Sequence, residues 1–367
     1  MGKKQELQNA EKELETLVKD TNAKIVELGK YDYSLYVALV NIQERFDKIR
    51  NTPTEKQLEY REIKKISSSW KQQVDTITND FEHAKKVDAN IAGAGTALGA
   101  GVAAFGPTAA MGFATTFGVA STGTAISALS GAAATNAALA WLGGGALSAG
   151  GGGVLAGKAM LAMAGPIGWT IAGASLLISL LFFWKAKKKR DKLYDIFLLV
   201  NKKDRNSYRQ AIVELNERIK RIKKETIMLN EAVQEIVTFG TDYRAMTESQ
   251  QYKLGAYVNL MKASTQLLVN PIMSLLPKFT EKDYDNYMRN NKDYSYSYQK
   301  KVKNFVLYMA NFLYEIETDN SDKEVLCSHF RNKQMKNFRE GMNLEKDDIN
   351  LNLFYFVDEI LKFKYNH

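Results

Sequence analysis

The sequence predicts an all-α fold: a long antiparallel helical bundle, or stalk, with a Gly/Ala-rich hydrophobic helical head inserted between two heptad arms. Two stretches of the chain repeat their apolar residues at heptad spacing, which is typical of paired helices. Between them, residues 91–184 contain 20 of the 25 glycines and a single charged side chain, Lys158. The chain has only 5 prolines and few glycines outside that block, which argues against a loop-rich β fold.

Changes in composition divide the chain into four predicted parts. Residues 1–90 form an N-terminal helical arm, and residues 91–184 form a hydrophobic membrane-insertion head. Residues 185–240 form a second helical arm, and residues 241–367 form a C-terminal helical region. The two arms and the C-terminal region carry all of the 41 Asp and Glu residues, and all of the 50 Lys and Arg residues except Lys158.

The N-terminal arm predicts two amphipathic helices separated by Pro53, because the residue before a proline is driven out of the α region. Thr21 and Asp32 are polar interruptions of the first apolar series. Both series fit core packing within a bundle, while oligomer contacts along the same seam remain an alternative. The two series are Leu14, Val18, Ile25, Leu28, Leu35, Leu39, Ile42, Phe46 and Ile49, then Ile63, Ile66, Trp70, Val74, Ile77 and Phe81.

The strongest membrane signal is the segment GPIGWTIAGASLLISLLFFW, residues 165–184. About 20 apolar residues span a bilayer as a helix, so the whole block has the length for two to four passes. A basic cluster follows at once and is expected to bind anionic headgroups. The residues expected to insert are Gly165, Trp169, Leu176, Leu177, Leu180, Phe182, Phe183 and Trp184, and the cluster comprises Lys185, Lys187, Lys188, Lys189 and Arg190.

The rest of the block is rich in Ala, Gly, Ser and Thr. The pairs Gly95 with Gly99 and Gly153 with Gly157 are spaced for close packing of helices in lipid. Lys158 is a charge at membrane depth, which makes it a functional candidate. Its alternative role is at a hairpin end, where the ammonium group reaches the headgroups. The block as a whole has a second interpretation, as a helical hairpin buried in a soluble protein.

The second arm resumes the heptad between residues 208 and 239, after a polar joint near residue 201. Gly240 is placed to end this helix, and Thr247 with Gln250 fits a capping box at the start of the next one. If the helices that flank the block pair antiparallel, the block emerges as a tip at one end of the stalk.

The sequence lacks the patterns expected of an enzyme. It contains no GxxxxGK[ST], HExxH or GxSxG motif. One Cys and three dispersed His residues disfavour a metal centre, and no cofactor is expected. Basic residues near the tyrosines of the C-terminal region alternate with Asp and Glu, so we expect no nucleic-acid partner.

The layout resembles bacterial α-helical pore-forming proteins of the cytolysin A and tripartite enterotoxin type. The stretch STGTAISALSGAAATNAALAWLGGGALSAGGGG, residues 121–153, with GPIGW, residues 165–169, also looks like glycine-zipper-type membrane segments. The resemblance covers roughly residues 1–240 and concerns layout and composition, so no functional residue is transferred. The apolar block departs from the pattern because it is about twice as long as a simple two-helix tongue.

Together these features predict a membrane-active helical protein, a pore-forming or permeabilising toxin or effector that oligomerises on insertion. Its expected partners are the lipid bilayer and either copies of itself or related helical subunits. The first residues contain no apolar secretory region, so we expect membrane association from the cytoplasm or at the inner membrane, with a soluble form before insertion. The alternatives are a permanent membrane anchor or scaffold and a soluble helical interaction protein with a buried hydrophobic hairpin.

Overall fold

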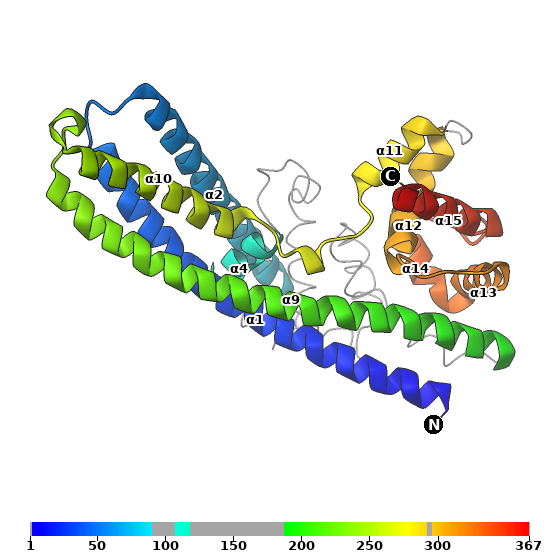
Figure 1. Cartoon of the computed structure of the whole chain (residues 1–367). Helices are drawn as coiled ribbons and strands as arrows, with labels where there is room; N and C mark the ends of the chain where they lie inside the picture. Colours follow the sequence, from blue (N-terminus) through cyan, green and yellow to red (C-terminus); the bar gives the residue numbers. More distant parts are fainter. Residues whose placement is uncertain (1, 90–106, 118–186, 292–295, 367) are drawn as a thin grey trace.

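The computed structural model describes residues 2–89, 107–117, 187–291 and 296–366, and these residues form helices and connecting turns (Figure 1). The all-α prediction is therefore confirmed. The α-helices are α1 (Lys3–Asp47), α2 (Thr54–Ala89), α4 (Pro107–Phe117), α9 (Lys187–Ile236), α10 (Glu248–Val269), α11 (Glu281–Asn290), α12 (Tyr296–Phe312), α13 (Asn320–Phe330), α14 (Lys336–Gly341) and α15 (Leu351–Asn366). Short 3₁₀ turns lie at Val237–Phe239 (η3), Tyr243–Ala245 (η4), Met273–Leu275 (η5) and Lys333–Met335 (η6).

The stalk is built on α1 and α9, which lie side by side along most of their length (Figure 1). Contacts occur at four levels along the pair, and each one joins two residues that are 192 positions apart in the sequence. Lys3 pairs with Asp195, Glu13 with Arg205, and the Lys223 ammonium lies 4.1 Å from the centre of the Tyr31 ring. At the far end, Arg50 and Asp242 form a parallel bridge.

This constant separation means that α1 and α9 run parallel. The antiparallel pairing considered from the sequence concerned the two helices that flank the apolar block, α2 and α9, so it did not anticipate this parallel pair. The heptad seams themselves are buried as expected: Leu28, Leu35 and Leu39 of α1 and Leu215 and Leu229 of α9 have no exposed surface. A heptad places apolar side chains on one face but has no direction, so it is equally compatible with parallel and antiparallel partners.

Two further helices run antiparallel to this pair. On α2, Lys64 pairs with Asp47, Ser67 accepts a hydrogen bond from Gln43, and Trp70 packs 5.6 Å from Tyr36, measured between ring centres. On α10, Lys253 pairs with Glu235 near the turn that joins it to α9. The buried side chains of α10 belong to the core of the stalk.

The path of α2 separates the two described helix ends that flank the apolar block, Ala89 and Lys187. Because α2 runs back along α1 from Pro53, the register of its contacts with α1 places its last residue, Ala89, at the level of the first half of α1. Lys187, where α9 begins, lies beyond the level of Lys3, since Lys3 pairs with Asp195. At 1.5 Å per residue, Ala89 and Lys187 are roughly 30–40 Å apart along the stalk. If the flanking helices ended together, their ends would meet at a tip. The described helix ends do not meet in this way.

The polar joint that we expected near residue 201 does not interrupt α9. The helix is continuous because neighbouring elements hold its charged residues. Lys203 donates to the carbonyl groups of Asn311 and Phe312 at the end of α12, and Arg205 pairs with Glu13 of α1. Farther along, α9 ends at Ile236, a 3₁₀ turn follows, and Gly240 has a φ of 78°, which confirms it as the stop signal.

The helices from α11 to α15 form a second core, which we call the C-terminal lobe. The rings of Phe305, Phe330 and Phe354 meet there at 5.3–6.2 Å between centres. The first turns of α9, including Leu193 and Phe197, complete this core. Because the rest of α9 belongs to the stalk core, this helix joins the lobe to the stalk.

The parallel arrangement predicts which lysines a short amine-reactive cross-linker joins. Lys30 and Lys224 are both exposed and lie at about the same level of the α1–α9 pair. Lys4 and Lys224 are separated by about 28 residues along the axis, or roughly 40 Å. We expect mass spectrometry to find the cross-link between Lys30 and Lys224 and none between Lys4 and Lys224. The opposite pattern would contradict the parallel pairing.

Candidate functional site

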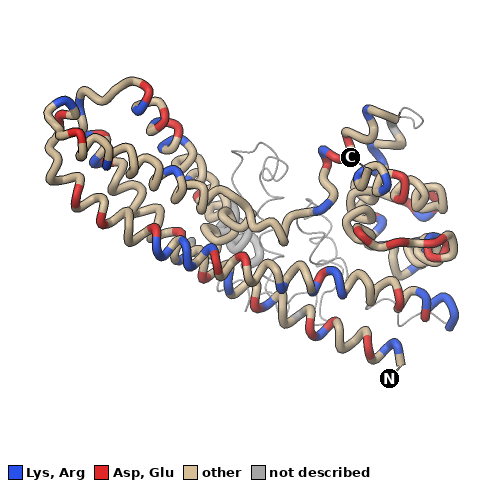
Figure 2. Tube along the Cα trace, viewed as in Figure 1, with Lys and Arg blue, Asp and Glu red and all other residues tan. Residues whose placement is uncertain are grey.

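The candidate site is where the apolar block meets the stalk. Within the described residues the block is represented by α4, and the chain that follows the block enters the structure at the start of α9. Several predicted residues lie outside the described residues: those proposed for insertion, the glycine pairs, Lys158 and Lys185. Their roles remain predictions. Lys187, Lys188 and Lys189 of the basic cluster are exposed on the first turn of α9, and Arg190 is partly buried. Figure 2 shows basic residues, in blue, at this end of α9.

Helix α4 is buried in the stalk. It packs against α1, α2 and α10, and every side chain from Ala109 to Phe117 is buried. The rings of Phe113 and Phe117 lie 4.6 Å apart, measured between their centres. No residue of α4 is charged. Part of the uncharged block is therefore core material of the stalk in this structure.

Two glycines allow the backbones of α1 and α4 to touch. A Cβ atom on Gly29 would overlap the carbonyl oxygen of Thr108, and one on Gly112 would overlap the carbonyl oxygen of Ile25. The crossing therefore requires glycine on both helices. Neither residue belongs to a motif in the sequence, although Gly29 carries a signal: a glycine inside a charged amphipathic helix costs about 1 kcal/mol relative to alanine.

Polar contacts hold the C-terminal half of α4. The indole Nε1 of Trp70 donates a hydrogen bond of 3.2 Å to Thr115 Oγ1. The backbone N–H of Ile272 donates to the carbonyl of Thr116 at 2.7 Å. The second contact satisfies a carbonyl near the end of α4, which the helix itself leaves without a partner.

Asp32 is a buried carboxyl group beside this crossing. Its side chain has no exposed surface, and neither oxygen forms a hydrogen bond of good geometry within the described residues. Burial raises the pKa of Asp32 well above its usual value, while nearby Thr115 and the charge of Arg218 act in the opposite direction. By contrast, the polar seam residues Thr21 and Thr226 each bond to a carbonyl of their own helix.

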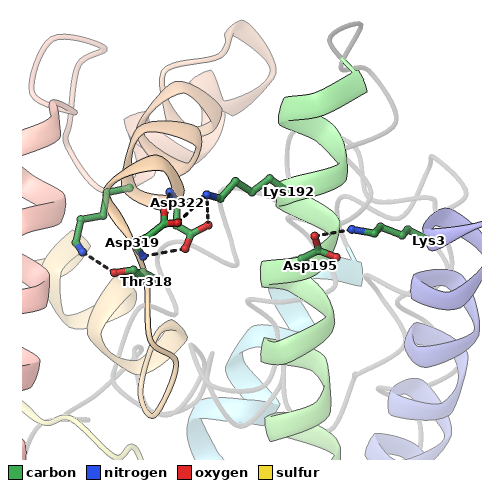
Figure 3. Close-up of polar contacts among 7 residues, drawn as sticks. Lys3, Lys192, Asp195, Thr318, Asp319 and Asp322 are labelled. Carbon is green, nitrogen blue, oxygen red and sulfur yellow. Dashed lines mark hydrogen bonds and ion pairs between the residues drawn. The ribbon is translucent and has the colours of Figure 1, made fainter.

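The start of α9 is fixed on two sides by ion pairs (Figure 3). Lys192 contacts Asp319 at 3.0 Å and Asp322 at 3.2 Å, and these two aspartates form the capping box of α13. On the other side, Asp195 pairs with Lys3 of α1 at 2.6 Å. The chain that leaves the apolar block is thus tied to the C-terminal lobe and to the N-terminal helix within its first turns.

A small cavity of about 70 Å³ lies at the junction of stalk and lobe, and Lys203, Asp204 and Tyr208 line it. Burial raises the pKa of Asp204 to about 6, although the charge of Lys203 opposes the shift. Lys203 is occupied by two carbonyl groups of α12, a favourable place for a cation at the end of a helix. We therefore interpret these groups as part of the joint between stalk and lobe.

The described residues provide no group of three His, Cys, Asp or Glu side chains that is placed to hold a metal ion. None of the helices in this part of the chain has the length and apolar character needed to cross a bilayer. No protein-family model matches the chain, and no curated protein and no solved structure matches it either.

The close crossing of α1 and α4 predicts opposite effects for two glycine-to-alanine substitutions. Gly29→Ala is expected to destabilise the protein by about 1–3 kcal/mol, because the methyl group has no space against the backbone of α4. Gly255→Ala in α10 meets no atom within 4 Å and is expected to stabilise it by up to about 1 kcal/mol. Urea unfolding of the two variants measures both changes, and an equal response of the two would contradict the crossing.

The hydrogen bond to Thr115 predicts a further difference between two threonines. Thr115→Val leaves the buried indole N–H of Trp70 without its acceptor, so we expect a loss of about 1–3 kcal/mol. Thr78 is a matched control, because its hydroxyl group bonds only to the carbonyl of Val74 in its own helix. Thr78→Val is expected to change the unfolding free energy by less than about 0.5 kcal/mol. Equal losses in thermal or urea unfolding would rule out a special role for Thr115.

Proposed function

We propose that this chain is a membrane-active helical protein that packs part of its apolar block against the stalk and inserts the block into a bilayer, where it oligomerises and permeabilises the membrane. One observation carries the proposal: a block of 94 residues with a single charge joins the helical arms, and its described part, α4, is core material of the stalk. The toxin or effector role belongs to the same proposal.

The composition of α4 supports a reversible association. Met111, Phe113 and Phe117 are its large apolar side chains, and each contributes about 1.5–3 kcal/mol when fully buried. The other residues of α4 are Ala, Thr, Gly and Pro, which bury less apolar surface. An uncharged helix with this composition has no ion pair to break when it moves from the stalk to another apolar environment.

The charge distribution supports an anionic membrane as the partner. The chain has a formal net charge of +9, and α9 contains fourteen Lys and Arg residues against eight Asp and Glu residues. Lys187, Lys188 and Lys189 are exposed where the chain leaves the apolar block. A Lys or Arg close to an anionic bilayer contributes about 1 kcal/mol to binding, so these residues favour docking of this end of α9.

The resemblance to α-helical pore-forming proteins of the cytolysin A and tripartite enterotoxin type enters the proposal as a similarity of layout. A stalk of long helices carries an apolar segment within one chain. The helix ends that flank the block, Ala89 and Lys187, lie apart along the stalk, so insertion from a single tip is not part of the proposal.

A soluble helical interaction protein is the second candidate, and the burial of α4 favours it. If the whole block serves as core, removal of residues 91–184 unfolds the arms and the full chain leaves membranes intact. A permanent membrane anchor is the third candidate. Alkaline carbonate extraction of the expressed protein identifies it, because an anchor stays with the membrane and a dormant soluble form is released.

Dye release from anionic liposomes tests the proposed function. The full chain is expected to release dye, and Leu177→Lys should reduce the release by about 10- to 100-fold, since a lysine at the bilayer centre costs about 3 kcal/mol. Leu199→Lys is the matched control, because Leu199 is already 51% exposed on α9 and its substitution adds the same charge outside the block. This control should release dye like the unmodified chain.

The proposal fails if the full chain releases no dye at any protein concentration or pH. If Leu177→Lys and Leu199→Lys release dye equally well, the segment 165–184 is not the part that enters the bilayer. Protein that is retained by carbonate-washed membranes before any trigger would favour the permanent anchor.

A further inference from the structure

We propose that Asp32 is a proton-controlled latch for α4: the helix stays packed on α1 while the carboxyl group holds a proton, and it leaves when the group ionises. The inference rests on the proposed function in one respect: the latch controls when the block leaves the stalk. The packing and release of α4 can be measured without any membrane.

The first observation is the position of Asp32. It follows Gly29 by three residues, so both lie on the same face of α1. Gly29 is the residue at which the backbones of α1 and α4 touch. The carboxyl group has no exposed surface. A charge there is therefore shielded from water only as long as the helices around it stay packed.

The second observation concerns Thr115, the group of α4 that acts on Asp32, and the residue of α2 that bonds to it. Helix α4 contributes Thr115 and has no titratable residue. Helix α2 contributes Trp70, whose N–H donates to the Thr115 oxygen at 3.2 Å. Thr115 therefore retains only its own hydroxyl proton to offer a neighbour. A single neutral hydroxyl group does not replace the several hydrogen bonds that a carboxylate makes in water.

The third observation concerns the positive charge on α9. Arg218 is the cation that acts on Asp32, but its guanidinium Nη1 donates to the carbonyl groups of Leu267 and Asn270 at 2.6 and 2.7 Å. It is therefore engaged at the end of α10 and forms no ion pair with Asp32 among the described contacts. The remaining charged groups that act on Arg218 are Glu214 and Arg221 of α9.

These contacts fix the direction of the pH dependence. Burial raises the pKa of Asp32 well above its ordinary value in the packed state. Once α4 has left and water reaches the carboxyl group, the pKa returns toward about 3.9. The packed state is thus fully favoured below that ordinary value and loses stability as the pH rises toward the pKa of the packed state. The ratio of packed to released protein falls by up to about tenfold per pH unit in this window.

A buried thiol on α4 measures the release. Thr116 has no exposed surface, and its hydroxyl group has no hydrogen-bond partner among the described residues, so Thr116→Cys keeps the shape of the site. The substitution is made together with Cys327→Ala, and the full chain is labelled with a thiol reagent between pH 5 and 9. A peptide of residues 107–117 with the same Thr116→Cys change gives the unprotected rate at each pH. The ratio of the two rates is the protection factor of α4.

We expect the protection factor to fall by up to about tenfold per pH unit in the protein with Asp32. With Asp32→Asn it should stay constant over the same range, because the amide does not titrate. Asp20→Asn is the matched control: Asp20 is exposed on the same helix, and its replacement should leave the fall unchanged. Circular dichroism at each pH shows that the stalk itself remains folded.

A protection factor that is independent of pH in the unmodified chain overturns the latch, and this holds even if Asp32→Asn does not fold. A fall that persists in a folded Asp32→Asn protein overturns it as well. Dye release is recorded separately at the same pH values. A fall in the protection factor without dye leakage supports the latch and contradicts the proposed function. Dye leakage without a fall in the protection factor supports the proposed function and contradicts the latch.

Discussion

The parallel pairing of α1 with α9 sets the path of the rest of the chain. Two parallel helices cannot be joined by a short turn, since the chain must return to the starting end before the second helix begins. Here α2 covers part of that return, and α4, which lies in the chain between α2 and α9, is packed into the stalk. The four contacts at a spacing of 192 residues, from Lys3 with Asp195 to Arg50 with Asp242, fix the register of this pair. The levels at which α2 ends and α9 begins follow from that register.

The all-α fold could be predicted because it depends on local features. Heptad spacing, the proline at position 53, the capping box at Thr247 and the glycine at position 240 each act within a few residues, and each has its expected place in the structure. The direction of the long helices depends on which seams meet, and a heptad carries no direction. The predicted joint near residue 201 was wrong for a similar reason: the groups that hold Lys203 lie more than a hundred residues away, in α12.

The candidate site was predictable in composition but not in geometry. The absence of charge marked residues 91–184, whereas the contact of Gly29 with α4 requires knowledge of which turn of α1 meets the block. Asp32 appeared in the sequence as a polar interruption of the seam, like Thr21. The structure separates the two, because a threonine can bond to its own helix and an aspartate cannot satisfy a carboxylate there. The predicted inserting residues lie outside the described residues and remain predictions.

The same pairing has a consequence for the order in which the protein is made. At about 5–20 residues per second, the ribosome needs on the order of 10–40 s to synthesise the 192 residues that separate partners in α1 and α9. During that time the apolar face of α1 has no α9 to cover it, and the whole uncharged block emerges before its second flanking helix exists. Contacts between residues so distant in sequence also slow folding. The nascent chain therefore passes through a stage in which chaperones or a membrane can reach its most apolar quarter before the stalk has formed.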